Sequence, residues 1–230
     1  MFLDIEKAFD SVPRTAIWEC LMKKNVPMEL IQSVKMLYDD CYSCVQVGNG
    51  YSDWFQTCRG VQQGSALSPL LFITIMDEII KEVKQTTNMD LKAFAFADDI
   101  VIWGNSEMEV QERLNVWNDH LKKYGLKVSA TKTAAMSVNR QVSKDNIMLE
   151  GVQLETVKQY QYLGSIISRD NRIQLELNNR IQKSSQFYQQ VRYLLWNKQV
   201  PLRSKQTLFQ TYFVPILTYG LETCTTTKKR

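Results

Sequence analysis

Histidine is almost absent from this sequence of 230 residues, in which His120 is the single example. A catalytic triad built on histidine and a histidine-rich metal site are therefore nearly excluded. His120 lies in the pattern "NDHLKKYG", which predicts the surface of a helix. The five cysteines are an odd number, and Cys41-x-x-Cys44 has no second pair at zinc spacing. We therefore expect reduced thiols.

Long apolar runs and a signal sequence are also lacking. No apolar stretch reaches the roughly 18 residues that a membrane span needs. The N-terminal residues do not form a basic segment followed by an apolar stretch of the signal type. We expect a soluble intracellular protein, in the nucleus or the cytoplasm, without a membrane partner. Repeats and low-complexity tracts are absent too, apart from the basic tail "TTTKKR".

Charge is distributed unevenly along the chain. Residues 1–120 hold 10 Lys and Arg against 18 Asp and Glu, whereas residues 121–230 hold 18 against 6. The first half is therefore acidic and the second strongly basic, although the whole chain has a net charge of only +4. A basic folded half indicates a nucleic-acid partner, and the alternative is that these charges solvate helix faces.

The order of predicted elements indicates an α+β fold. "MFLDI" predicts a short strand, apolar periodicity after Pro13 predicts helices, and "CVQVGNGYSDWF" predicts a hairpin around Asn49-Gly50. Up to about residue 138 the elements fit a mainly antiparallel sheet with helices on one face. "YQYLGSII" predicts a further strand, and from about residue 169 the pattern becomes helical, so we expect a domain boundary near residue 168.

Two adjacent aspartates, Asp98 and Asp99, interrupt the apolar run "FAFADDIVIWG". The apolar residues on both sides predict a buried hairpin with the pair at its tip. Asp is a common turn residue, so a purely structural explanation exists. A third carboxylate, Asp4, closes the apolar strand "MFL" and can lie at the end of a neighbouring strand.

Three carboxylates at the edge of an apolar sheet are unfavourable unless something neutralises them, as hard divalent cations do. Mg²⁺ prefers one or two carboxylates plus water and phosphate oxygens. Two such ions can activate an attacking oxygen and stabilise a leaving one. The pattern therefore predicts phosphoryl transfer with two Mg²⁺ ions, or Mn²⁺ in their place; spacing alone leaves polymerase, nuclease and cyclase open.

Five motifs in order resemble the reverse transcriptases of non-LTR (LINE-type) retrotransposons. They are "FLDIEKAFDSVPR", "RGVQQGSALSPLLF", "FAFADDIVIWG", "YGLKVSATKT" and "YQYLGSIIS". The segment from "RIQKSSQFYQQ" to "LTYGLET" resembles the thumb of that family and the segment that follows it. The resemblance covers essentially the whole chain and implies a polymerase-type palm followed by a mainly helical thumb.

The resemblance assigns roles to residues by their position. Asp4 and Asp98 match the two catalytic, metal-binding aspartates, with Asp99 as the supporting second acid. Phe9 matches the bulky side chain that lies against the sugar of the incoming nucleotide, where a phenyl ring penalises a 2′-hydroxyl. Without the resemblance, Phe9 is equally well explained as a core aromatic. Asp10 is expected to be structural.

A loop and a lysine complete the implied site. Gln63 and Gly64 match the loop that lies against the nucleotide and the template base, because Gly permits close backbone approach and Gln can hydrogen-bond. On their own they read as an ordinary loop before a helix. Lys132 matches a proposed proton donor to the pyrophosphate leaving group, and its alternative is a solvated lysine at a strand edge.

The implied domains are a palm over residues 1–168 and a helical thumb with the following segment over residues 169–230. The fingers region, which precedes the first motif in the family, is expected to be absent. Basic residues of the thumb are predicted to face the phosphates of a template–primer duplex. These residues are Arg172, Arg180, Lys183, Arg192, Lys198, Arg203 and Lys205.

The leading hypothesis is an RNA-directed DNA polymerase that transfers a nucleotide from a dNTP to a primer 3′-hydroxyl on an RNA template. The first alternative is a catalytically inactive, nucleic-acid-binding remnant of a retrotransposon. A second is an intron maturase-type reverse transcriptase, which shares the "ADD" hairpin, although "VPR" and "YGLET" fit the retrotransposon group better. A viral RNA polymerase fits less well, because Ala97 stands where that group usually has Gly and because Phe9 opposes ribonucleotides.

Overall fold

The computed structural model describes residues 1–87, 91–138 and 146–223. The chain divides into two compact units. Unit 1 comprises Met1–Ala135 and Lys144–Glu155, and unit 2 comprises Met136–Ser143 and Thr156–Arg230. In the described ranges, no helix combines the length and the apolar character that crossing a membrane would require.

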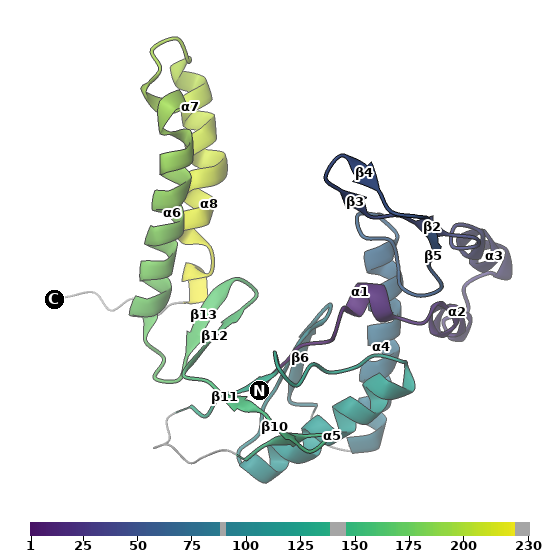
Figure 1. Ribbon diagram of the computed structural model, residues 1–230. Helices are drawn as coiled ribbons and strands as arrows, with labels where there is room; N and C mark the ends of the chain where they lie inside the picture. Colours follow the sequence, from purple (N-terminus) through teal and green to yellow (C-terminus); the bar gives the residue numbers. More distant parts are fainter. Residues whose placement is uncertain (88–90, 139–145, 224–230) are drawn as a thin grey trace. The chain divides into compact units, whose positions relative to one another are not determined.

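A five-stranded sheet supports unit 1 (Figure 1). β1 pairs antiparallel with both β7 and β8, and β6 pairs antiparallel with β7. The prediction of a mainly antiparallel sheet is thereby confirmed. The strands in their spatial order are β11 (Glu155–Thr156), β8 (Ala134–Ala135), β1 (Phe2–Leu3), β7 (Asp99–Ile102) and β6 (Ala93–Phe96).

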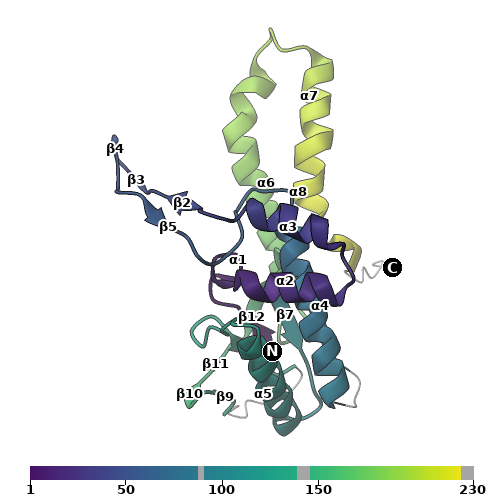
Figure 2. The same cartoon turned by 90° about the vertical axis from the view of Figure 1, so that its right-hand side faces the viewer.

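The two faces of this sheet differ because successive strand residues point to opposite sides. Leu3, Ile100 and Ile102 point into the core and are at most 2% exposed. There they pack with α4 (Ser68–Thr87) and α5 (Glu107–Lys123) (Figure 2), and α2 (Arg14–Lys23) packs on α4. The opposite face carries Asp99, opposite Phe96 in the β6–β7 hairpin. The buried helical residues include Ile17, Leu71, Phe72, Ile75, Ile79, Leu114, Trp117 and Leu121.

An arm of two short strand pairs follows α3 (Met28–Met36) (Figure 2). β2 (Tyr42–Ser43) pairs with β5 (Phe55–Gln56), and β3 (Gln46–Val47) pairs with β4 (Gly50–Tyr51). The predicted hairpin is present, but Val47 lies opposite Gly50, so its turn is Gly48-Asn49 and not Asn49-Gly50. Unit 1 also contains the short helix α1 (Ala8–Ser11) and the pair β9 (Met148–Leu149) and β10 (Val152–Gln153).

Unit 2 consists of a strand hairpin and a pair of antiparallel helical segments (Figure 1). β12 (Gln159–Tyr162) pairs with β13 (Ser165–Ser168), so the single strand predicted for "YQYLGSII" is wrong. Leu163 and Gly164 have φ values of 47° and 82°, which reverse the chain between the two strands. The helical part comprises α6 (Ile173–Trp196), α7 (Leu202–Leu208), a π-helix (Phe209–Phe213), α8 (Val214–Thr218) and a 3₁₀ turn (Leu221–Thr223).

The hairpin and the helices of unit 2 pack together, through contacts of β13 with α6. Unit 2 as a compact body therefore begins again at Thr156, before the sequence-based boundary near residue 168. The assignment of residues 1–168 to a palm and of residues 169–230 to a thumb stays a prediction. Residues 224–230 of that assignment lie outside the described part of the chain.

Candidate active site

Strand pairing brings the three predicted carboxylates to one end of the sheet. Phe2 lies opposite Val101 and Leu3 lies opposite Ile100. One further step along this register sets Asp4 beside Asp99. Residues opposite one another in an antiparallel pair point to the same face, so both carboxylates lie on the face away from the core helices.

The β6–β7 turn places the third carboxylate at the tip of the hairpin. Phe96 pairs with Asp99, which leaves Ala97 and Asp98 as the two turn residues. Ala97 has a φ of 52°, a conformation that costs a residue with a Cβ about 1–3 kcal/mol. The turn therefore keeps a strained backbone at the point where Asp98 joins the other two acids.

The backbone of Asp4 is held by the segment that follows α5. Its N–H donates to Thr133 Oγ1 at 3.2 Å, and its carbonyl accepts from the Ser129 N–H at 2.8 Å. Thr133 is only 1% exposed. Because these bonds use main-chain atoms, they fix Asp4 without occupying its carboxylate.

The side chain of Asp4 keeps its acceptor capacity. Its Oδ1 atom is buried and has no hydrogen-bond partner within the described residues. The nearest cation is Lys132, whose Nζ lies 3.7 Å from that oxygen. The lysine side chain is 69% exposed, so water screens much of this attraction. A buried carboxylate oxygen without a donor is a ready ligand for a hard cation.

The electrostatics of Asp99 also favour a cation at this site. Burial, followed by the negative charges of Asp98 and Asp4, raises the pKa of the Asp99 carboxyl above its ordinary value. Among the described residues, both charges that shift this pKa are negative. The site therefore has an excess of negative charge.

The three carboxylates are near one another without forming a closed ligand cage. Within the described ranges, no three Asp, Glu, His or Cys side chains lie close enough together to hold a metal ion. The negative charges of Asp4 and Asp98 act unfavourably on the charged form of Asp99. Their chemistry nevertheless fits Mg²⁺, which takes one or two carboxylates and fills its other positions with water and phosphate oxygens.

Phe9 packs at the border of the core. Its ring stacks on Phe72 with the ring centroids 4.8 Å apart, and it remains partly exposed. The structural explanation for this aromatic therefore holds in part, because one face is committed to packing. Its partial exposure leaves the predicted contact with a nucleotide sugar open as a proposal.

The loop that carries Gln63 and Gly64 is attached to the segment around Phe9. The Val61 N–H donates to the Phe9 carbonyl at 2.8 Å. Gln63 Nε2 donates to Asp10 Oδ1 at 2.9 Å, so the structure brings the predicted loop and the predicted aromatic into one neighbourhood. Gly64 has a φ of 86° and open space around its Cα, which leaves room for a ligand to approach.

Arg14 contributes to this neighbourhood in a way that the sequence did not reveal. Arg14 Nε donates to the Gly60 carbonyl at 3.0 Å and Nη1 donates to the Tyr38 carbonyl at 2.9 Å. The guanidinium thus ties the start of the loop to the end of α3. The sequence carries no local signal for either hydrogen bond, because 46 and 24 residues separate the partners. The only hint of a role for Arg14 was its place in the "VPR" motif.

The basic residues of unit 2 differ strongly in exposure. Arg172 is exposed and forms an ion pair with Asp170 at 2.7 Å. Arg192, Lys198 and Arg203 are exposed, and Lys183 and Lys205 are partly exposed. These six side chains remain candidates for contacts with phosphates.

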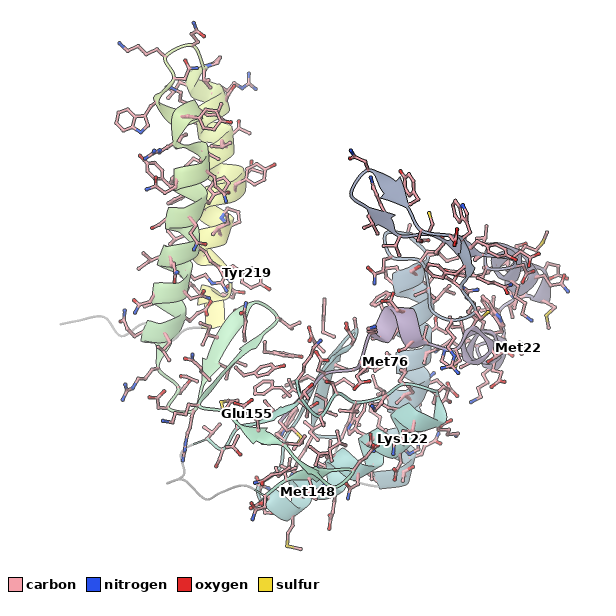
Figure 3. The ribbon with its side chains drawn as sticks, in the orientation of Figure 1. Met22, Met76, Lys122, Met148, Glu155 and Tyr219 are labelled. Carbon is pink, nitrogen blue, oxygen red and sulfur yellow. The ribbon has the colours of Figure 1, made fainter. Side chains whose placement is uncertain are left out.

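Arg180 is the exception, and its predicted phosphate contact is not compatible with this structure. Its side chain is 5% exposed and pairs with Glu176, which is 7% exposed. It also donates to the carbonyl of Gly164, and its Cζ lies 4.8 Å from the ring centroid of Tyr219. Figure 3 labels Tyr219, which lies beside the β12–β13 hairpin. A guanidinium committed to a buried carboxylate, a carbonyl and a ring is not available to a polynucleotide.

Comparisons with known proteins show what the chain is similar to. The family model described as "Reverse transcriptase (RNA-dependent DNA polymerase)" matches residues 1–167. A Pol polyprotein from a type-1 retrotransposable element R2 of Nasonia vitripennis is 28% identical over 76% of this chain. The Pol polyprotein from element R2DM of Drosophila melanogaster is 26% identical over 95% of it.

A third relative is the probable RNA-directed DNA polymerase from transposon BS of Drosophila melanogaster, 28% identical over 96% of this chain. The chain spans 19%, 22% and 26% of the length of these three relatives, in the order given. The similarity therefore concerns one part of much longer proteins.

Proposed function

Because the chain belongs to the reverse transcriptase (RNA-dependent DNA polymerase) family, we propose that Asp4, Asp98 and Asp99 form the nucleotidyl-transfer site of an RNA-directed DNA polymerase. The observation that carries this proposal is the uncompensated negative charge at one end of the sheet. It consists of a buried Asp4 oxygen without a hydrogen-bond donor among the described residues, and of an Asp99 carboxyl whose pKa is raised by burial and by the negative charges of Asp98 and Asp4.

The three carboxylates would hold two Mg²⁺ ions, or Mn²⁺ ions. Bound there, the ions supply the positive charge that activates the primer 3′-hydroxyl and stabilises the leaving pyrophosphate. The chain itself fixes the Asp4 backbone and leaves the buried Asp4 Oδ1 without a hydrogen-bond donor among the described residues. The proposed substrates are an RNA template with a DNA primer and a dNTP, so we place the activity in the nucleus or the cytoplasm.

The other residues of unit 1 act on the nucleotide. As the primer oxygen bonds to the α-phosphorus, the bond from that phosphorus to the pyrophosphate oxygen breaks. Lys132 offers a proton or a positive charge to the leaving pyrophosphate. The exposed side of the Phe9 ring excludes a 2′-hydroxyl, and Gln63 donates its amide to the nucleotide or to the template base.

Unit 2 supplies the contacts with the nucleic-acid backbone. Exposed and partly exposed cations there would neutralise phosphates of the template–primer duplex, an attraction that weakens with salt. Arg180 is left out of this set because of its burial. The proposed contacts are Arg172, Lys183, Arg192, Lys198, Arg203 and Lys205.

The decisive experiment is primer extension by this chain on an RNA template with dNTPs and Mg²⁺. The wild-type chain is compared with the double variant Asp98→Asn/Asp99→Asn and with the matched control Asp39→Asn/Asp40→Asn. The control removes another adjacent pair of exposed acids, which lies after α3. Extension by the wild type and the control, but not by the site variant, is the expected result.

A second readout covers the case in which none of the three proteins extends the primer. Mg²⁺ should raise the melting temperature of the wild type and the control but not that of the site variant. Salt-sensitive duplex binding with neither extension nor Mg²⁺ stabilisation would overturn the proposal in favour of an inactive nucleic-acid-binding remnant. The names of the three relatives favour a retrotransposon origin over an intron maturase.

A further inference from the structure

The last turns of α6 carry an unusual exposed surface. Trp196 follows Tyr193 by three residues and Arg192 by four, so it neighbours both on the surface of the helix. Tyr193 is 68% exposed and Trp196 is 77% exposed. Large aromatic side chains at this exposure gain little from burial within unit 2, so folding of the unit does not explain them.

The Trp196 ring is held in place although it is exposed. Its indole N–H donates to the Tyr188 hydroxyl at 3.1 Å. Tyr188 in turn lines an apolar cavity of about 270 Å³ between α6 and the helical segments that follow, together with Phe187, Val191, Leu195, Leu208 and Phe209. The indole is therefore anchored to the packed seam of unit 2 and needs little ordering before a ligand binds.

Charge identifies the kind of ligand. Residues 177–221 contain no Asp or Glu. Within the described residues of unit 2, the ion pairs are Arg172–Asp170 and Arg180–Glu176, so the exposed and partly exposed cations from Lys183 to Lys205 form none there. A ligand for this surface must therefore be anionic, and it must present flat surfaces to an indole.

We propose that Arg192, Tyr193 and Trp196 bind unpaired nucleotides of an RNA strand, with a base stacked on the Trp196 indole and an adjacent phosphate at Arg192. Single-stranded binding sites combine cations along the backbone with aromatic rings under the bases. In a duplex the base faces are covered by their neighbours, so an indole reaches them only where the strand is unpaired.

The rest of the exposed side of α6 fits this ligand better than a lipid surface. Gln182, Gln186 and Gln189 are exposed on that side of the helix, where a membrane-binding helix would need apolar residues. Amide side chains hydrogen-bond to base edges and to sugar hydroxyls. The inference rests on the proposed function only in taking a polynucleotide as the ligand of unit 2.

The test measures binding of a fluorescein-labelled, unstructured 15-nucleotide RNA to the 230-residue chain by anisotropy, in EDTA and without dNTP. Trp196→Leu should weaken binding by about 5- to 150-fold, the range of one lost stacking contact, while the salt dependence stays unchanged. Trp196→Phe, which keeps an aromatic face, should retain most of the affinity. Arg192→Gln should lower the slope of log K against log salt by about 0.7.

Trp54→Leu is the matched control, because Trp54 is 70% exposed but lies in the arm of unit 1; it should bind as the wild type does. A blunt RNA duplex should bind the wild type and Trp196→Leu equally. Wild-type binding by Trp196→Leu, or an equal loss for the duplex, would overturn the inference. Binding to anionic phosphatidylserine vesicles is measured in parallel. A Trp196→Leu variant that loses vesicle binding but keeps RNA binding would also overturn the inference. Because metal and dNTP are absent, failure of polymerisation cannot affect these outcomes.

Discussion

The Arg180 guanidinium lies over the ring of Tyr219, with its Cζ atom 4.8 Å from the ring centroid. The same guanidinium pairs with Glu176 and donates to the carbonyl of Gly164 in the β12–β13 turn. The Tyr219 hydroxyl donates to the neighbouring Leu163 carbonyl at 2.7 Å. Two side chains that are 39 positions apart therefore fasten the strand hairpin to both helical segments of unit 2.

Removing Arg180 alone should destabilise unit 2 strongly. Arg180→Met leaves the buried Glu176 carboxylate without its partner, a change that typically costs about 3–5 kcal/mol. The double variant Arg180→Met/Glu176→Met removes both charges and should recover a large part of that loss. Hydrogen exchange followed at peptide resolution over β12, β13 and α6 measures both effects. A drop of about 0.9 in the duplex-binding salt slope of the double variant would instead indicate a phosphate contact.

Asp99 should make the stability of unit 1 depend on pH in an unusual direction. Its pKa is raised in the folded protein, so the folded state binds the proton more tightly than the unfolded state. Stability from this group is therefore present below the unfolded pKa and is lost as the pH rises through the folded pKa. Asp99→Asn removes that loss of stability. Because Asp99 is exposed and water screens its charge interactions, the gain in stability should be small.

In EDTA at pH 7, we expect Asp99→Asn to raise the melting temperature by about 1–2 °C, a shift that corresponds to a few tenths of a kcal/mol. Below about pH 3 the variant and the wild type should melt together, because Asp99 is then mostly protonated in both states. Mg²⁺ should stabilise the wild type more than the variant. A lower melting temperature for Asp99→Asn at pH 7 would show that the carboxylate is stabilising and not repelled.

The gathering of the acids could be predicted from sequence, whereas most of their surroundings could not. Asp4 and Asp99 each adjoin a short apolar strand, and pairing of the two strands was enough to bring them together. The burial of Arg180 depends on Tyr219, far along the chain, which no local pattern shows. The hydrogen bond from Gln63 to Asp10 joins residues 53 positions apart, so no local pattern shows it either.

The β12–β13 hairpin shows a different limit of the sequence. "YQYLGSII" contains enough apolar and β-branched residues to predict a continuous strand. The reversal rests on Leu163, which adopts a positive φ of 47° beside Gly164. Leu is rarely found in that conformation, so composition favoured the wrong structure, and only Gly164 gave a signal for the turn.

Lys132 should matter for the reaction rate and not for stability. Its side chain is 69% exposed and its Nζ lies 3.7 Å from Asp4 Oδ1, so the ion pair contributes at most about 1 kcal/mol. If the lysine assists departure of pyrophosphate, Lys132→Gln should lower the single-turnover incorporation rate by about 100-fold or more. Lys132→Arg keeps the charge and should lose less. An unchanged rate with Lys132→Gln would reduce this residue to a solvated surface lysine.

Gly60 and Gly64 form a matched pair for testing how the nucleotide loop is seated. Both have positive φ values, 78° and 86°, so a Cβ at either position costs about 1–2 kcal/mol in backbone strain. At Gly60 the Cβ would also lie 2.6 Å from the Asp10 carbonyl oxygen, whereas Gly64 has nothing within 4 Å. Gly60→Ala should therefore destabilise unit 1 clearly more than Gly64→Ala in urea unfolding. It should also raise the KM for dNTP, because the clash moves the segment that holds Gln63 against Asp10. Equal destabilisation by both substitutions would mean that the loop moves freely over Asp10 and that its contact with the Phe9 segment does not position the nucleotide.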